Sequence, residues 1–366
     1  MAKTTTIEVR PGPRKARRYQ VLIEPGLLER LPDLLAGSFP GRKIWIVTDS
    51  NVLRLYGRRF HRRLVLAGAD AGLIEIPPGE ESKREEVLRA LQTGLLDHGI
   101  ERNSLIVALG GGVVGDLAGF AAATVLRGIE YIQVPTTLLA QVDSSVGGKV
   151  GINHRLGKNL IGAFHHPSAV YIDPRVLSTL PSREFRNGLA EMIKIAAALD
   201  RGLFRDLERN GRKISKDSEL VLAQRIARAI GLKAAVVAKD EQEAGLRKVL
   251  NLGHTIGHAV EAASGFRIHH GEAVAIGLAA EAEIAVEMDL LPRKEHARLL
   301  RVLRNAGLPT RIPRDLGRRR FLRALSADKK SERGAPRFVL LHRIGHSVVG
   351  VEVPTPFLIE RVGGSR

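Results

Sequence analysis

Polar side chains in the second half of the chain are spaced so that they can act together in binding or catalysis. Asn251, His254 and His258 follow one another at steps of three and four residues. On a helix, residues at these steps share one face, and Arg247 extends that face if the helix reaches back far enough. Because polar groups are costly to bury without partners, we expect this stripe to line a cleft or to hold a metal ion.

A glutamate before this stripe and a histidine after it complete an open metal site. Glu191 lies one helical turn before Lys194 among apolar neighbours, and His270 lies where another helix is expected to begin. One glutamate and two histidines are typical ligands of a catalytic metal that keeps a position free for water or substrate. The chain contains no cysteine, which excludes thiolate ligands. Spacing alone leaves two pairings open, either His254 with His258 or one of them with His270. Histidines that are exposed, or satisfied by backbone hydrogen bonds, are the competing interpretation.

A glycine-rich turn in the first half has the composition of a phosphate-binding loop. Gly110–Asp116 follows the apolar run Leu105–Leu109 and precedes an alanine-rich segment. Glycines between a strand and a helix let backbone N–H groups approach a phosphate beside the positive end of the helix. The alternative is a tight turn without a ligand. Asp49 follows the apolar run Ile44–Thr48, where a carboxylate can bind a ribose hydroxyl.

A second group of polar and charged residues is concentrated among glycines between residues 127 and 159. Its members are Thr136, Thr137, Asp143, Lys149, Lys158 and Asn159. Long stretches of this composition are commonly either disordered or functional, and the interleaved apolar residues argue against disorder. We therefore expect an anion-binding pocket at the carboxyl ends of the strands.

Strand-like and helix-like segments alternate in the first half, which predicts a doubly wound, mostly parallel sheet. The expected strands are apolar runs, as in buried parallel sheets, and Ser82–Leu96 is an example of the helical segments between them. The strands are expected at Tyr19–Ile23, Ile44–Thr48, Leu73–Ile76, Leu105–Leu109, Tyr131–Val134 and Val170–Ile172.

From about Pro181 onward the composition changes to long segments rich in alanine, leucine and charged residues. Helices are expected at Glu184–Ala198, Leu220–Lys239, Gly253–Ala263, Glu272–Met288 and Arg293–Ala306. Arg337–Leu341 has the composition of a strand, and no element is assigned to Arg311–Arg323. Prolines at positions 174 and 181 interrupt the chain. The sequence thus predicts a Rossmann-like α/β domain over residues 1–178 and an all-α domain over residues 179–366.

The chain carries a large excess of positive charge, with 57 Lys+Arg against 39 Asp+Glu and a net charge of +18. Basic surfaces attract nucleic acids, but this excess is spread along the chain and aromatic residues make up only 4% of it. We therefore expect no nucleic-acid partner and assign part of the charge to an anionic small-molecule substrate. The first residues lack the apolar core of a signal peptide, and no apolar run approaches the roughly 20 residues of a membrane span. A cytoplasmic protein without membrane contact is expected.

Five long motifs, in this order, resemble the 3-dehydroquinate synthases, which are sugar-phosphate cyclases. The motifs read GGGVVGDLAGFAAATVLRGIEYIQVPTTLLAQVDSSVGGKVGINHRLGKNLIGAF, GLAEMIKIA, LNLGHTIGHAVE, HGEAVAIG and DKKSERGAPRFVLL. Several motifs in fixed order are far more specific than any one of them. The resemblance implies a dehydroquinate synthase-like fold, in which an NAD-binding α/β domain precedes a helical metal-binding domain, and it implies a homodimer.

The resemblance also implies roles for individual residues. Glu191, His254 and His270 correspond to ligands of a divalent metal, zinc or cobalt, and His258 then corresponds to a catalytic residue. NAD contacts are implied for Asp49, Asn51, Glu80, Lys83, Gly111, Gly112, Val113, Asp116, Thr136, Thr137, Leu139, Asp143, Lys149 and Lys158. Substrate contacts are implied for Arg127, Asp143, Lys149, Asn159, Lys194, Lys233, Arg247, Asn251, His258, His270 and one of Lys329 and Lys330. Catalytic roles among these are implied for Lys149, Lys194, Lys233, Arg247, Asn251 and His258.

The activity implied is that of a carbon–oxygen lyase in aromatic amino acid biosynthesis, the shikimate pathway. Its substrate, 3-deoxy-D-arabino-heptulosonate 7-phosphate, is converted to 3-dehydroquinate and phosphate. The steps are transient oxidation by NAD+, phosphate elimination, re-reduction and intramolecular aldol closure. The many cationic positions fit a substrate that carries both a carboxylate and a phosphate.

Two other enzyme activities are compatible with the same motifs. A sibling cyclase would make a valiolone- or inosose-type ring from a different sugar phosphate. A metal- and NAD-dependent polyol dehydrogenase would release NADH stoichiometrically and would need fewer cations around its pocket. The carboxylate-bearing substrate is favoured by the joint presence of Arg127, Lys149, Asn159, Lys233, Arg247, Asn251 and His258. Ile195 departs from the family, which often has tyrosine there, but it concerns packing more than chemistry.

Overall fold

The computed structural model describes residues 4–9, 18–326 and 337–354, which form two compact units. The first unit contains Met1–Leu180 and Ser218–Ala234, and the second contains Pro181–Asp217 and Ala235–Arg366. The sequence predicts a single boundary after residue 178, whereas the chain passes between the units at three points. The additional segment lies on helix α8 (Glu219–Lys239), whose Lys233 bonds to Asp143 of the first unit.

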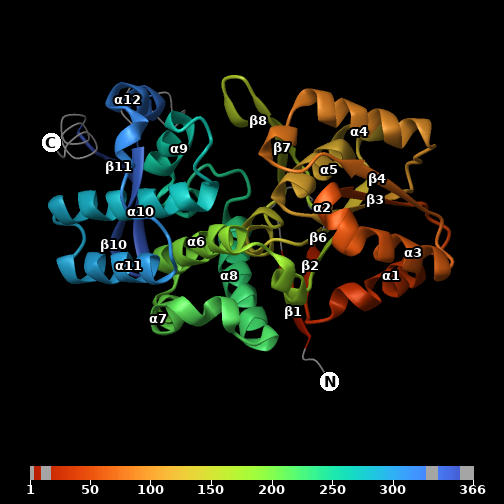
Figure 1. Cartoon of the computed structure of the whole chain (residues 1–366), viewed down its shortest axis with the longest axis horizontal. Coiled ribbons are helices and arrows are strands. Elements are labelled where there is room, and N and C mark those ends of the chain that lie inside the picture. The colour runs from red at the N-terminus through yellow and green to blue at the C-terminus, as the bar shows by residue number, and fades with distance from the viewer. Residues whose placement is uncertain (1–3, 10–17, 327–336, 355–366) are drawn as a thin grey trace. The chain divides into compact units, whose positions relative to one another are not determined.

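A seven-stranded sheet in the order β1-β2-β9-β6-β5-β3-β4 forms the centre of the first unit (Figure 1). Its strands are β1 (Thr5–Val9), β2 (Tyr19–Ile23), β3 (Ile44–Asp49), β4 (Ala71–Ile76), β5 (Leu105–Gly110), β6 (Glu130–Pro135) and β9 (Ala169–Ile172). Strand β1 pairs antiparallel with β2, and every other pair in this sheet is parallel. The six expected strands are confirmed, and β1 is an addition.

Helices cover both faces of this sheet because successive strand residues point to opposite sides. On β3, Ile44 and Ile46 join one buried cluster, whereas Trp45 and Val47 join the other. The first cluster contains apolar residues of α1 (Leu27–Ser38) and α3 (Arg58–Leu66). The second contains those of α4 (Glu85–Asp97) and α5 (Gly112–Thr124). The short helix α2 (Ser50–Val52) follows β3 directly. This arrangement confirms the doubly wound α/β fold.

Part of the glycine-rich stretch that was expected to be an extended loop forms a hairpin. Strands β7 (Lys149–His154) and β8 (Gly157–Phe164) pair antiparallel in a separate two-stranded sheet. Two of its glycines permit this pairing at close range. A Cβ at Gly151 would lie 2.4 Å from the Ile161 carbonyl oxygen, and one at Gly162 would lie 2.2 Å from the Val150 carbonyl oxygen. Glycines that look like loop residues in the sequence therefore serve strand packing.

Within residues 181–217, 235–326 and 337–354, the second unit is helical apart from one hairpin (Figure 1). Its helices are α6 (Ser182–Leu199), α7 (Arg201–Asn210), α9 (His254–Ala263), α10 (His270–Glu287), α11 (Arg293–Asn305) and α12 (Arg318–Ser326). The strand expected at Arg337–Leu341 is present as β10 (Arg337–Arg343), which pairs with β11 (His346–Glu352). The all-α prediction therefore holds except for this hairpin. Among the described residues, no helix has both the length and the apolar content to cross a membrane.

Candidate active site

The glycine turn between β5 and α5 lies at the carboxyl end of the sheet, where its backbone is closely packed. Gly111 precedes the first residue of α5, and Thr136 donates its N–H to the Gly110 carbonyl at 2.9 Å. A Cβ at Gly111 would lie 3.0 Å from Thr137 Cγ2, and one at Gly112 would lie 3.1 Å from Ser144 Oγ. The turn therefore leaves room only for bare backbone, as a phosphate-binding loop at a helix N-terminus requires.

Lys83, Asp116 and Asn159 form a polar cluster in which a buried ammonium joins two segments of the first unit. Lys83 is 4% exposed, and its Nζ donates to Asp116 Oδ2 at 2.6 Å and to Asn159 Oδ1. Burial raises the pKa of the Asp116 carboxyl, and Lys83 opposes this rise. Asn159 adopts a left-handed backbone conformation with φ 53°. The cluster therefore brings together three of the predicted cofactor and substrate residues.

Lys233 and Asp143 form a second buried pair in the same unit, although ninety residues separate them. Asp143 lies in the π-helical turn η4 (Ala140–Ser144), and Lys233 lies on α8. Lys233 Nζ donates to the Asp143 backbone oxygen at 2.6 Å and to its Oδ1 at 2.5 Å. Lys233 is only 6% exposed, and the Asp143 carboxylate offsets the cost of burying the charged ammonium group of Lys233.

The other predicted residues of the first unit lie at the ends of elements or on the β7–β8 hairpin. Asp49 caps α2, because its Oδ1 accepts the N–H groups of Asn51 and Val52. Glu80 accepts a hydrogen bond from Asn153 at 2.8 Å. The remaining positions are Val113 in the first turn of α5, Arg127 at the end of a 3-10 turn with φ 68°, Leu139 before η4, Lys149 on β7 and Lys158 on β8.

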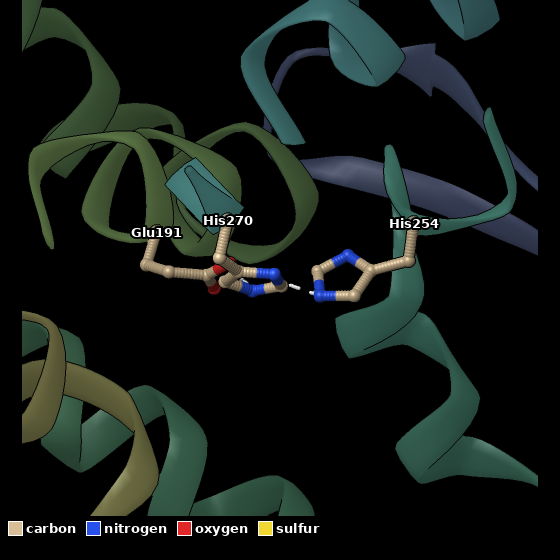
Figure 2. A group of neighbouring side chains, drawn as sticks. All are labelled: Glu191, His254 and His270. Carbon is tan, nitrogen blue, oxygen red and sulfur yellow. Dashed lines mark ion pairs between the residues drawn. The ribbon is translucent and has the colours of Figure 1, made fainter. Parts of the chain in front are cut away.

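Three helices of the second unit bring Glu191, His254 and His270 to one point, as Figure 2 shows. Glu191 lies on α6, His254 is the first residue of α9, and His270 is the first residue of α10. Their ligand atoms lie within 4.8 Å of one another. Glu191 Oε1 lies 3.2 Å from His270 Nε2 and 3.7 Å from His254 Nε2. Of the pairings that spacing left open, this geometry joins His254 with His270.

Charges around Glu191 hold its carboxylate in the ionised form. Glu191 is 0% exposed, and its Oε2 lies 2.5 Å from Lys194 Nζ. Burial favours the neutral carboxyl, but Lys194 and His270 outweigh it and hold the pKa of Glu191 below its usual range. Burial also opposes the imidazolium of His270, yet Glu261 and Glu191 raise the pKa of His270 to about 10. Oε2 of Glu191 is thus paired with Lys194, whereas Oε1 faces the Nε2 atoms of both histidines.

The helices that carry these ligands approach one another through glycines and one buried carboxylate. A Cβ at Gly277 of α10 would lie 1.9 Å from the Gly253 carbonyl oxygen. Gly253 has φ 78° and ends the preceding turn, so that α9 begins at His254. Glu281 of α10 is 0% exposed and accepts the N–H groups of Gly253 at 2.6 Å and Ile256 at 3.0 Å. The start of α9 is thereby fixed against α10.

The predicted continuous helical stripe is wrong in one respect, because two of its residues precede α9. Arg247 and Asn251 lie on the 3-10 turn η7 (Leu246–Asn251), and the left-handed Gly253 separates this turn from the helix. Arg247 is 4% exposed, and its backbone N–H donates to Asp240 Oδ2 at 2.9 Å. Asn251 donates to Glu243 Oε1 and lines a pocket of about 590 Å³ in this unit.

Comparison with known proteins places these features in one family. Family models described as 3-dehydroquinate synthase N-terminal and 3-dehydroquinate synthase C-terminal match residues 73–187 and 188–331. A 3-dehydroquinate synthase of Gloeobacter violaceus is 47% identical over 341 residues, which cover 93% of this chain and 94% of the relative. The chain belongs to the 3-dehydroquinate synthase family. The family predicted from the motifs is thus confirmed.

Solved structures of related cyclases share the fold of this family member over nearly the whole chain. A 2-deoxy-scyllo-inosose synthase complexed with carbaglucose-6-phosphate, NAD+ and Co2+ has a TM-score of 0.88 at 27% identity, and the match covers 98% of this chain and 99% of that one. A 2-epi-5-epi-valiolone synthase from Streptomyces hygroscopicus, with NAD+ and Zn2+ bound, has a TM-score of 0.87 at 31% identity. That match covers 96% of this chain and 98% of the other.

One buried acid beside the 3-dehydroquinate synthase motif residues is missing from the sequence prediction. Glu261 is 2% exposed on α9, and its Oε2 lies 3.2 Å from His270 Nδ1. It follows His254 by seven residues and His258 by three, so helical spacing places it on their face. The spacing does not show that Glu261 contacts His270 of α10. Lys329 and Lys330, one of which was predicted to contact the substrate, lie outside the described residues.

Proposed function

We propose that this chain converts 3-deoxy-D-arabino-heptulosonate 7-phosphate into 3-dehydroquinate and inorganic phosphate, as a carbon–oxygen lyase of the shikimate pathway. The observation that carries the proposal is the convergence of Glu191, His254 and His270 in a chain that shares 47% identity with a 3-dehydroquinate synthase. The substrate is a sugar phosphate with an added carboxylate, and the buried cations Lys194, Lys233 and Arg247 suit such an anion.

Glu191, His254 and His270 are the residues that we propose to hold a divalent metal, zinc or cobalt. The fit rests on the donor set and on Glu191, a fully buried carboxylate whose Oε1 faces the Nε2 atoms of both histidines. Gly111 and Gly112 present a backbone turn that fits the pyrophosphate of NAD+, with Lys83 and Asp116 nearby in the same unit. NAD+ supplies a reversible hydride acceptor when bound, and the metal supplies a Lewis acid for a substrate hydroxyl.

The chain's own side chains bind and orient the substrate and move its protons. We assign the carboxylate and phosphate contacts to the cationic residues, and Arg247 is held in place through its backbone by Asp240. Lys194 neutralises the buried Glu191 carboxylate and so keeps it ionised next to the substrate. His258, one helical turn after His254, is the candidate for proton transfer at the substrate hydroxyls, with Asn251 as a hydroxyl-binding partner.

The remaining assignments belong to the same proposal. The motif resemblance supports NAD contacts by Asp49, Asn51, Glu80, Val113, Thr136, Thr137, Leu139, Asp143, Lys149 and Lys158. Substrate contacts rest on the same resemblance for Arg127, Asp143, Lys149, Asn159 and His270. So does a homodimeric assembly, and we also propose a cytoplasmic location. The net charge of +18 is consistent with an anionic substrate.

The direct test is phosphate release from the heptulosonate 7-phosphate with catalytic NAD+, in the presence and absence of a metal chelator. NADH absorbance is followed in the same sample. We expect metal-dependent phosphate release over many turnovers without net NADH. Absence of phosphate release by folded, metal-loaded protein would contradict this substrate, and turnover of another sugar phosphate would instead identify a sibling cyclase. Steady accumulation of NADH with a polyol would identify a dehydrogenase.

A further inference from the structure

His270 is held between two buried carboxylates that lie on different helices. Its Nε2 lies 3.2 Å from Glu191 Oε1, and its Nδ1 lies 3.2 Å from Glu261 Oε2. Glu191 and Glu261 are 0% and 2% exposed, so water does not compete freely for either carboxylate. The two ring nitrogens of His270, a proposed metal ligand, therefore each face a buried carboxylate. One of these carboxylates, Glu191, is itself a proposed metal ligand, and the other, Glu261, is not.

The ring of a neutral histidine carries one proton, and this limits what each nitrogen of His270 can do. A nitrogen that binds a metal must present its lone pair, so the proton then resides on the other nitrogen. An ionised carboxylate only accepts hydrogen bonds. When Nε2 of His270 binds the metal beside Glu191, the remaining ring proton lies on Nδ1, and Glu261 Oε2, 3.2 Å away, accepts it.

We infer that Glu261 is a positioning residue for the metal site: it accepts the Nδ1–H of His270 and so fixes both the tautomer and the orientation of this ligand. The inference rests on the proposed function, because it takes Glu191, His254 and His270 as the metal ligands. Carboxylates in this position raise the basicity of a ligand histidine and restrict the rotation of its ring.

The Glu261 carboxylate also lies near His258, so a second metal site is an alternative interpretation of these residues. Ligand atoms of His258, Glu261 and His270 lie within 4.8 Å of one another, a spacing that a second metal ion would fit. Such an ion would require His270 to bind metals through both nitrogens at once, which means losing both ring protons. The positioning role needs only the neutral ring, and for this reason the geometry favours it.

The experiment compares three variants with the unaltered protein. Glu261→Ala removes the acceptor, and Glu261→Gln keeps an amide oxygen that can still accept the Nδ1–H. Glu295→Gln is the matched control, because Glu295 is 5% exposed in the same unit and contacts Arg298, Arg201 and the Ile344 N–H instead. Zinc and cobalt affinity is measured by chelator competition, together with metal stoichiometry and the visible absorption of bound Co2+. Circular dichroism of the metal-free proteins checks that each variant folds.

We expect Glu261→Ala to weaken metal binding by about 10- to 100-fold and to change the Co2+ spectrum, since the ligand is no longer oriented. Glu261→Gln should lose less affinity than Glu261→Ala, and Glu295→Gln should bind metal as the unaltered protein does. Phosphate release should fall in the same order.

Three results would overturn the inference, and each has its own signature. Unchanged affinity and spectrum in folded Glu261→Ala would reduce Glu261 to a packing role. Two metal equivalents in the unaltered protein, with one lost in Glu261→Ala, would establish a second metal site. No metal binding by the unaltered protein would overturn the proposed metal site itself, and the inference with it.

Discussion

At the scale of single residues, three buried lysines each meet a carboxylate. Lys83 meets Asp116, Lys233 meets Asp143, and Lys194 meets Glu191. Removing one partner of such a pair is costly because the other charge is left in a poorly hydrated place. The carboxylates therefore allow the lysines to remain charged despite their burial.

Replacing Lys83 with methionine should destabilise the protein by about 3 kcal/mol at neutral pH. The Asp116 carboxylate then loses its cation, while its surroundings remain those in which burial raises its pKa. A carboxyl with a raised folded-state pKa is favoured at low pH and penalised as the pH rises through that value. The deficit of Lys83→Met should therefore shrink as the pH is lowered, which urea unfolding at several pH values measures.

The Lys83→Met, Asp116→Asn double variant controls for this effect. It removes the charge that the single variant leaves unpaired. The double variant should therefore recover part of the lost stability, and its remaining deficit should not depend on the ionisation of residue 116. Equal stability of Lys83→Met and the unaltered protein would show that the pair contributes nothing.

At the scale of elements, the geometry of the proposed metal ligands depends on how closely α9 and α10 pack. The Gly277–Gly253 contact leaves no room for a side chain, and Glu281 anchors the first turn of α9 from α10. A small displacement of either helix would move His254 relative to His270, because each is the first residue of its helix. Helix packing and metal binding are thus coupled.

Substitution of Gly277 by alanine should cost several kcal/mol, about 2–4, and should weaken metal binding as well. The added methyl group would lie 1.9 Å from the Gly253 carbonyl oxygen, so α9 and α10 have to separate. Gly231→Ala on α8 is the matched control, because nothing lies within 4 Å of its Cβ. That change should stabilise the protein by about 0.5–1 kcal/mol, since alanine favours helix. Thermal unfolding and metal titration of both variants measure the difference; equal effects would contradict the packing argument.

A second element contact predicts a dependence of stability on pH. Arg298 and Arg301 of α11 bind Glu208 of α7, with Arg298 Nη2 2.7 Å from Glu208 Oε2. Hydrogen bonds from Arg298, followed by those from Arg301, lower the pKa of Glu208 from its ordinary 4.5. A lowered folded-state pKa stabilises the protein above about pH 4.5, and this contribution is lost as the pH falls through the folded value.

Glu208→Gln should therefore lower the unfolding free energy by about 1–2 kcal/mol at pH 7 and by less below pH 4. Denaturant unfolding at both pH values measures the change. The exposed Glu283 of α10 offers a comparison, and Glu283→Gln should alter stability little at either pH. A constant deficit of Glu208→Gln at both pH values would indicate packing rather than ionisation.

The helices and strands also show which parts of the fold the sequence predicts and which parts it does not. Apolar runs of the central strands are continuous, and they predict all six of the parallel strands. The β7–β8 hairpin was missed because Gly151 and Gly162 read as loop residues. The break between η7 and α9 was missed because polar spacing continues across the left-handed Gly253. Glu191, 63 residues before His254, was grouped with the histidines by type, and its distance to them came only from the structure.

At the scale of the whole molecule, a bound metal should appear as added thermal stability. A ligand that binds only the folded state contributes RT ln(1 + [L]/Kd), about 2.7 kcal/mol at 100 times Kd. Chelator-treated protein should therefore unfold roughly 3–5 °C below zinc-loaded protein. Glu191→Gln should show no such difference, because one proposed ligand is altered. A metal-dependent shift that persists in this variant would place the stabilising ion elsewhere.

The division of α8 between the two units has a consequence for the order of synthesis. Residues 181–217 leave the ribosome before residues 218–234, although the latter complete the first unit. A nascent chain ending at residue 180 lacks Lys233 and the buried Ile226 and Ile230, so the sheet domain has to wait for part of its successor before its packing is complete. For the same reason, a recombination event that exchanges this domain between related genes has to join three crossover points in register, whereas an N-terminal domain made of one continuous segment needs one.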